Sequence, residues 1–225
     1  MDLFLSKETW LAISSPIFLS LQVSFVSTFF VMITGTLLAA KLARNRLKGK
    51  SLLETLLLLP LVLPPTVIGF LLLVIFGRNS IIGQIIEWFF HQPIIFTWLA
   101  AVIAAFVVSF PLMYQSAKSG LLQIDSAIED AARVDGANEW NVFTRISLPL
   151  AGHSLLTGSI LSFSRGLGEF GATLMFAGNI PGKTQTLPTA IYVAIDTGQT
   201  QLAWIWVISI IVISFLMLLV TQPRQ

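Results

Sequence analysis

Five long intervals of this chain contain no residue that is ionised at neutral pH. They separate Glu8 from Lys41, Glu54 from Arg78, Glu87 from Lys118, Arg145 from Arg165, and Asp196 from Arg224. A helix that crosses a bilayer needs about 20 apolar residues. Four of the intervals clearly exceed that length, and the other continues as an apolar segment beyond its second arginine. We therefore predict an all-α integral membrane protein, one transmembrane domain over residues 1–225, with spans at about 14–40, 53–76, 95–115, 150–176 and 201–221.

The composition excludes other classes of protein. Only 11% of the residues are charged and 55% are hydrophobic, whereas soluble domains carry about 25% charged residues. Because the chain has no cysteine, it offers no disulfide framework, thiolate zinc site or thiol nucleophile. The formal net charge is only +2, which does not indicate a nucleic-acid partner.

The distribution of Lys and Arg predicts the topology, because loops rich in these residues stay in the cytoplasm. The predicted cytoplasmic side carries nine cations, which are Lys41, Arg44, Arg46, Lys48, Lys50, Lys118, Arg133, Arg145 and Arg224. The opposite side carries three, Lys7, Arg78 and Lys183. We therefore expect the N-terminus outside and the C-terminus in the cytoplasm. The five cations of the first loop can fix this topology alone or also contact lipid or a partner.

The third loop, at about 116–149, is long enough to have a structure of its own. Asp125 or Ser126 can begin a helix there, and Glu129 stands at capping-box spacing from Ser126. Gly136 is expected to end this helix. A second helical segment from Asn138 to Ile146 then leads to the next span. A helix that docks on a partner and a solvated helical linker both fit this composition.

The spacing in this loop resembles the EAA loop of ABC-importer permeases. An acid-Ala-Ala run is followed after three residues by a glycine, and after nine more by Ile-x-Leu-Pro. The resemblance implies a coupling helix that docks in a groove of a cytoplasmic ATPase subunit. Either of two adjacent acids can take the acidic position. The implied coupling residues are Glu129, Asp130, Ala131, Ala132, Gly136, Ile146, Leu148 and Pro149.

Prolines interrupt the second predicted span. Pro60, Pro64 and Pro65 lie within six residues, and Thr66 follows them. Proline removes a backbone donor and clashes with the preceding turn, so this span must be kinked or broken. Broken backbone at membrane depth is tolerated only where it is buried in protein or lines a cavity. Pro64, Pro65 and Thr66 are therefore candidates for a hinge that lines a pathway, and a static kink is the alternative.

The fourth predicted span contains the only ionised pair inside a span, Arg165 and Glu169. At a spacing of four residues they share one helix face and can pair, which lowers the cost of both charges in the membrane. Arg165 could present a cation to a passing oxyanion, with Glu169 orienting it, or the pair could hold a helix bend. Gly168, Gly171 and Thr173 in the same block are further pathway or gate candidates.

Glycines of this span also form the pattern G-x-G-x-x-G, from Gly166 to Gly171. That pattern indicates a nucleotide site only between a strand and a helix, and no such unit is predicted here. Gly158, Ser162 and Gly166 instead repeat at intervals of four, which is typical of closely packed membrane helices.

These blocks, with Asn179-Ile-Pro-Gly182 and Leu187-Pro188, make residues 12–220 similar to the molybdate/tungstate permeases of type I ABC importers; sulfate permeases share much of the pattern. The resemblance implies a multi-pass protein of a prokaryotic cytoplasmic (inner) membrane that moves a tetrahedral oxyanion by alternating access. Molybdate or tungstate is the expected substrate, and a sulfate/thiosulfate permease is the alternative. A stand-alone channel or secondary carrier is less favoured, because neither inverted repeats nor several intramembrane acids are present.

The resemblance also implies partners. They are a second copy of the chain, a cytoplasmic ABC ATPase dimer, an extracytoplasmic oxyanion-binding protein and membrane lipid. The chain has no Gly-x4-Gly-Lys-Ser/Thr sequence, no catalytic constellation and no set of metal-ligating residues. We therefore expect a transporter subunit that is not itself an enzyme and holds no cofactor, with ATP and Mg bound by the partner ATPase.

Overall fold

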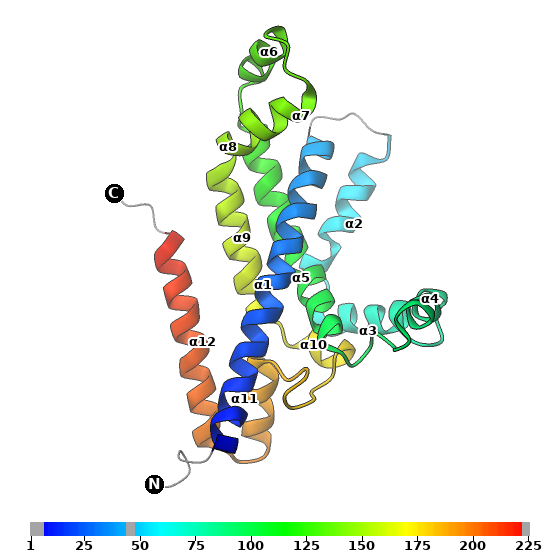
Figure 1. Ribbon diagram of the computed structural model, residues 1–225, viewed down its shortest axis with the longest axis vertical. Coiled ribbons are helices and arrows are strands. Elements are labelled where there is room, and N and C mark those ends of the chain that lie inside the picture. The colour runs from blue at the N-terminus through cyan, green and yellow to red at the C-terminus, as the bar shows by residue number, and fades with distance from the viewer. Residues whose placement is uncertain (1–6, 44–47, 222–225) are drawn as a thin grey trace.

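The computed structural model describes residues 7–43 and 48–221, and within these ranges all regular secondary structure is helical. Its centre is a bundle of three helices, α1 (Lys7–Ala43), α5 (Trp98–Leu122) and α9 (Gly152–Leu167), which pack against one another. The molecule is elongated along this bundle (Figure 1). Small side chains on α5, such as the fully buried Ala101 and Ala105, let the helices approach closely.

Among the described residues, three helices are long and apolar enough to cross a membrane, and the number rises to five if each bent pair is one span. The predicted all-helical membrane class with about five spans is therefore confirmed. Arg44, Arg46 and Arg224, which contribute to the predicted topology, lie outside the described residues. The orientation of the termini stays a prediction.

The second predicted span, 53–76, is two helices rather than one kinked helix. The chain bends by 117° between α2 (Lys50–Val62) and α3 (Pro65–Phe76). Leu63 and Pro64 between them have extended backbone, with ψ of 142° and 136°. The prolines thus produce a break, and α3 does not continue across the membrane along the axis of α2. α4 (Ile81–Phe90) follows, and α3 and α4 extend sideways from the bundle (Figure 1).

At the third predicted span, 95–115, the structure has α5, which begins at Trp98 and continues to Leu122. The loop expected from residue 116 therefore begins with almost two further turns of α5. It then forms α6 (Ser126–Val134), α7 (Glu139–Val142), the π-helical turn η2 (Phe143–Ser147) and α8 (Leu148–Leu150). These elements make one end of the molecule (Figure 1).

The fourth predicted span, 150–176, is interrupted at Gly168. α9 ends at Leu167, and the short helix α10 (Gly171–Phe176) packs mainly on α3. After a loop, α11 (Leu187–Asp196) and the start of α12 (Thr200–Thr221) lie at the opposite end of the molecule, and α12 runs back alongside the bundle (Figure 1). α12 packs mainly on α11 and is otherwise largely exposed.

The small residues that repeat in α9, Gly158, Ser162 and Gly166, pack against α5 and α1, as predicted. A Cβ on Gly158 would lie 2.7 Å from Ser116 Cβ of α5. Ser162 Oγ donates a hydrogen bond of 3.2 Å to the carbonyl of Ser109, and Gly166 faces Ser27 of α1.

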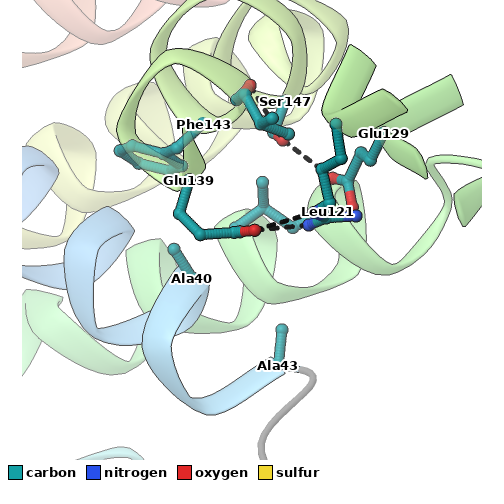
Figure 2. A pocket seen from close by; sticks show the side chains of 9 residues that line it. Ala40, Ala43, Leu121, Glu129, Glu139, Phe143 and Ser147 are labelled. Atoms are coloured by element: carbon teal, nitrogen blue, oxygen red, sulfur yellow. Dashed lines mark hydrogen bonds and ion pairs between the residues drawn. The ribbon is translucent and has the colours of Figure 1, made fainter. Parts of the chain in front are cut away.

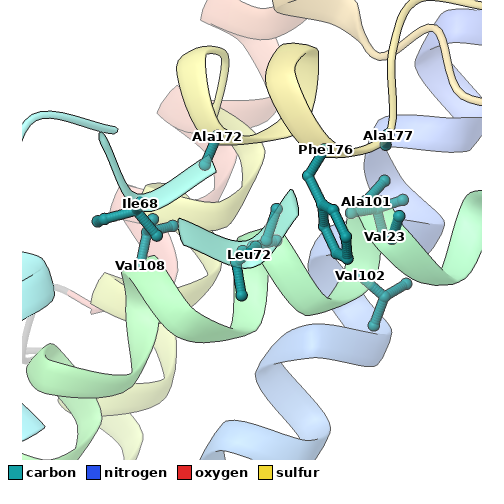
Figure 3. Packing of buried hydrophobic residues seen from close by; sticks show 12 residues of the cluster. Val23, Ile68, Leu72, Ala101, Val102, Val108, Ala172, Phe176 and Ala177 are labelled. Atoms are coloured by element: carbon teal, nitrogen blue, oxygen red, sulfur yellow. The ribbon is translucent and has the colours of Figure 1, made fainter. Parts of the chain in front are cut away.

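An apolar core joins α1, α3, α5 and α10. Figure 3 shows Phe176 of α10 pointing toward Ala101 and Val102 of α5, with Leu72 of α3 beside it. The two segments that follow the helix breaks, α3 and α10, are therefore fixed to the bundle by the same core.

Candidate functional site

Helix α6 has defined ends. The carboxylate of Asp125 accepts a hydrogen bond of 2.9 Å from the amide of Ala127 and caps the first turn. At the other end the amides of Gly136 and Ala137 bond to Arg133 O and Ala132 O, which is a Schellman motif, and Gly136 has a φ of 90°. The predicted stop at Gly136 is confirmed.

Glu129 does not form the predicted capping box. Its side chain is almost fully buried and accepts a hydrogen bond of 2.7 Å from Ser147 Oγ of η2. Figure 2 shows the hollow of about 350 Å³ that these residues line together with Glu139, Phe143 and the end of α1. The buried acid thus ties α6 to the segment that leads into α9.

Arg133 connects three acids of the loop. Its Nε and Nη2 donate to both carboxylate oxygens of Glu139 at 2.7 and 3.1 Å, and its Nη1 donates to Asp130 at 2.7 Å. Nη2 also lies 3.8 Å from Glu129. The hydrogen bond from Arg133 lowers the pKa of Glu139, and the acids in turn raise the pKa of Arg133. Because Asp130 and Glu139 are exposed, these contacts orient the loop more than they stabilise it.

The two adjacent acids of the loop therefore differ in environment. Glu129 is buried among the partners described above, whereas the side chain of Asp130 is 67% exposed. Ala131 is exposed on α6 between Ile128 and Val134, which are 48% and 87% exposed. These three residues, spaced three apart, form an apolar outer face of α6, and the buried Glu129 lies on the inner side.

Pro149 explains the π-helical turn. Proline has no N–H, so the carbonyl of Arg145 loses its usual helical partner. The amide of Leu148 bonds instead to Phe143 O, five residues earlier. π-turns are rare and often occur at functional sites. Ile146 and Leu148 are half-buried in this stretch and Pro149 is exposed.

The structure brings together the two blocks at the helix breaks, although they are about 100 positions apart in sequence. A Cβ on Gly171 would lie 3.1 Å from Pro65 Cβ and 3.2 Å from Thr66 Cγ2. A Cβ on Gly69 would lie 2.8 Å from Ala172 Cα. We call this contact between α3 and α10 the joint. The glycines are needed there because backbone approaches backbone.

Arg165 and Glu169 pair, but not on one continuous helix as predicted. α9 ends between them, and Glu169 lies in the break. Its carboxylate accepts one hydrogen bond from Arg165 Nη1 and another of 2.8 Å from the amide of Ala172. Glu169 is buried, while the Arg165 side chain is 31% exposed. The acid therefore holds the bend and caps α10, and the cation remains partly accessible. Thr173 is buried, whereas Gly168 and Thr66 are exposed.

One polar cluster was not identified from the sequence. Glu54 of α2 accepts hydrogen bonds from Lys118 Nζ at 2.6 Å and from Tyr114 OH at 2.9 Å, both on α5. The sequence did contain a signal for this pair, because Glu54 and Lys118 lie at the predicted cytoplasmic ends of two consecutive spans. The groups of His, Asp and Glu in the described ranges include none that could hold a metal ion.

Comparisons with known proteins agree with this arrangement. The family model described as binding-protein-dependent transport system inner membrane component matches residues 12–222. The chain is 64% identical to the putative molybdenum transport system permease protein YvgM of Bacillus subtilis (strain 168), over 94% of this chain and 93% of that protein. It is 43% identical to the molybdenum transport system permease protein ModB of Escherichia coli (strain K12), over 92% and 90%.

A similar fold occurs in a solved structure of the MetNI methionine ABC transporter in an inward-facing conformation. The TM-score is 0.74 over 96% of both chains, at 16% sequence identity. Identity this low supports a shared fold alone.

Proposed function

The chain belongs to the family of binding-protein-dependent transport system inner membrane components, and from this premise we propose that it is the permease subunit of an ABC importer for molybdate. The observation that carries the substrate is the identity of 64% and 43%, over nearly the whole chain, to two relatives named as molybdenum permeases. Tungstate has the same charge and shape and is expected to pass as well, while sulfate/thiosulfate transport is the alternative.

The loop at one end of the bundle is proposed to couple the permease to a separate ATPase. The apolar outer face of α6, formed by Ile128, Ala131 and Val134, is exposed and offers small side chains at its centre. Glu129 and Ser147 connect this face to η2. A displacement of α6 by the ATPase would therefore move the start of α9. ATP and Mg are bound and used by that partner.

A second copy of the chain is proposed to complete the pathway. The exposed side of α9 carries His153 and Thr157 next to Leu156 and Leu161, and the half-buried Ser164 lies farther along it. Polar side chains on a membrane-crossing helix are costly against lipid, so His153 and Thr157 favour another protein surface or water. Two such faces that meet would enclose a weakly polar route for the anion.

The two helix breaks are proposed to form the gate region. Pro65 and Thr66 contact Gly171, and Pro64 precedes them in the break. Backbone broken at membrane depth is suited to lining a cavity. Arg165 has one partner in Glu169 and a partly exposed guanidinium. Because Glu169 already pairs with it, the partly exposed Arg165 would attract an oxyanion without holding it tightly, as transport requires. An extracytoplasmic binding protein would deliver the anion to this side.

Reconstitution tests the function. We expect the chain, co-purified with its ATPase and supplied with the binding protein, to import molybdate into liposomes with vanadate-sensitive ATP hydrolysis. Tungstate, sulfate and thiosulfate are tested in parallel. Uptake by the chain alone would indicate a channel or carrier, and preferential uptake of sulfate would overturn the substrate.

Coupling is tested on the same preparation. Ala131→Trp places a bulky side chain at the centre of the docking face, and it should separate ATP hydrolysis from uptake. Leu52→Trp, an exposed position on α2, is the matched control and should leave both rates near those of the unsubstituted chain. Equal rates in both variants would refute docking through this face.

A further inference from the structure

Helix α4 has an apolar face that nothing in the described chain covers. Ile81, Ile85, Trp88 and Phe89 point to one side at helical spacing, and their exposed fractions are 78%, 56%, 75% and 69%. Ile82 adds to the same side. The opposite side is a narrow stripe of Gly83, Gln84 and Glu87. The helix is thus amphipathic, with its apolar side turned outward.

The position of α4 is fixed by its contact with the end of α3. Ser80 caps α4 by accepting a hydrogen bond of 2.8 Å from the amide of Gly83. Gly83 itself packs against the carbonyl of Gly77, where a Cβ would have no room. The turn between the helices is therefore tight, and α4 keeps its direction relative to α3.

The polar stripe is bridged back to the turn. Arg78 Nε lies 3.7 Å from the carboxylate of Glu87, and both side chains are exposed. This places the charges of the segment on the side away from the five apolar residues. Such a division between a charged side and an apolar, aromatic side is typical of helices that lie in a membrane surface.

Length and position decide what can cover the apolar face. A helix of ten residues rises about 15 Å, which is half of the hydrocarbon thickness of a bilayer. α4 therefore does not cross the membrane. It connects α3 to the start of α5 and projects sideways from the bundle, far from the end that carries α6 (Figure 1). The preceding helix, α3, also exposes apolar side chains, at Phe70 and Val74.

We propose that α4 lies flat in the membrane surface on the side opposite α6, with Ile81, Ile82, Ile85, Trp88 and Phe89 in the boundary between lipid headgroups and acyl chains. The occupant of the face is lipid. Tryptophan favours this boundary because its ring is apolar and its N–H is polar. The apolar residues enter the bilayer, while Gln84, Glu87 and Arg78 remain in the headgroup water.

This placement has a consequence for the joint. α4 is attached to α3, and α3 contacts α10 through Gly69 and Ala172. A surface-bound α4 therefore sets the depth of the joint in the membrane. The inference needs only that the chain is a membrane protein, and it does not depend on the proposed substrate.

Spin labelling tests the placement directly, because the chain has no cysteine and a single introduced cysteine gives a unique label. Ile85→Cys and Phe89→Cys report on the apolar face and Gln84→Cys on the polar stripe, in the full chain in phosphatidylethanolamine/phosphatidylglycerol liposomes. Val212→Cys, exposed on α12, and Asp135→Cys, exposed beyond α6, are the references for lipid and water.

Collision rates with oxygen and with a water-soluble nickel chelate are measured at each label. We expect labels 85 and 89 to favour oxygen, at a depth of about 5–10 Å, and label 84 to favour the chelate. Preference of labels 85 and 89 for the chelate would place the face in water. Protection from both reagents would place it against protein, such as a second copy. Either result overturns the proposal.

A measurement without labels guards against local distortion by the substitutions. Brominated lipid quenches tryptophan fluorescence on contact. Trp88→Phe should remove a quenched component from the spectrum of the otherwise intact chain. The difference in emission between the unsubstituted chain and Trp88→Phe is the contribution of Trp88. If this contribution is as large in brominated as in ordinary lipid, α4 does not lie in the membrane surface.

Discussion

Ser147 donates a hydrogen bond of 2.7 Å to Glu129, a residue 18 positions earlier in the chain and almost entirely buried. This contact joins α6 to η2 across the loop. Arg133, Asp130 and Glu139 surround it with exposed ion pairs. The loop is therefore a small folded unit held by a buried polar contact, and this contact would transmit the movement of α6 that we propose toward α9.

Ser147→Ala is expected to loosen this unit. It removes a donor from a buried carboxylate, which costs about 1–3 kcal/mol locally. Amides of α7, η2 and α8 should exchange with deuterium faster, and uptake per ATP hydrolysed should fall. Asp130→Asn is the matched control, because Asp130 is 67% exposed and its pairing contributes little. A larger effect from Asp130→Asn than from Ser147→Ala would contradict the roles assigned to the two acids.

The contact between Arg133 and Glu139 predicts a dependence on pH. The hydrogen bond from Arg133 lowers the pKa of Glu139 from its ordinary value of 4.5. A lowered pKa stabilises the folded loop above the ordinary value, and this contribution is lost as the pH falls through the lowered pKa. Protection of the α7 amides, corrected for intrinsic exchange, should be constant from about pH 7 to 5 and decrease below about pH 4. In Glu139→Gln this decrease should be absent. An unchanged decrease would assign it to another group.

The sequence predicted the helical class and the approximate spans because charge is costly inside a bilayer and the 24 charged residues, Lys+Arg 13 and Asp+Glu 11, mark where spans end. It also located the break at Pro64, since proline acts through the local backbone. The loop was recognised from the spacing of its acid-Ala-Ala run, glycine and Ile-x-Leu-Pro. The end of α6 before Gly136 follows from the local preference of helix ends for glycine.

The interruption at Gly168 could not be predicted in this way. Residues 150–176 carry no ionised side chain other than Arg165 and Glu169, and the glycines among them weaken a helix without forbidding one. The break depends on the buried carboxylate of Glu169 capping α10 and on the fit of Gly171 against Pro65. Both are contacts of the folded chain. The pairing of Glu54 with Lys118 likewise depends on how α2 and α5 are rotated about their axes.

The joint between α3 and α10 is expected to tolerate no larger side chain at Gly69. Gly69→Val would force a Cβ to within 2.8 Å of Ala172 Cα and 2.9 Å of its carbonyl. Overpacking of this kind costs about 1–3 kcal/mol, so the melting temperature in detergent should fall. Gly152→Ala is the control, because nothing lies within 4 Å of a Cβ there and alanine favours a helix. Equal melting temperatures for the two variants would show that the joint can open.

The link between α2 and α5 is expected to be energetically coupled. Glu54 and Lys118 are 19% and 27% exposed and lie 2.6 Å apart. A double-mutant cycle with Glu54→Gln and Lys118→Met, measured by denaturant unfolding in micelles, should give a coupling of about 1–2 kcal/mol. The pair Arg78–Glu87, at 3.7 Å and more exposed, is the comparison and should give less than about 0.5 kcal/mol. The reverse order would remove the case for Glu54 as a structural link.

Variants of Arg165 and Glu169 can distinguish a structural role of this pair from a role in transport. Arg165→Gln leaves the buried Glu169 carboxylate without its cation, which costs about 3 kcal/mol or more, so this variant should be unstable. In Arg165→Gln with Glu169→Gln, the second glutamine can still accept the hydrogen bond from the Ala172 amide, and stability should recover. If the exposed part of the guanidinium attracts the anion, molybdate uptake by this stable double variant should stay low, and Arg165→Lys should keep part of it. Uptake by the double variant at the rate of the unsubstituted chain would show that the pair serves only to hold the bend between α9 and α10.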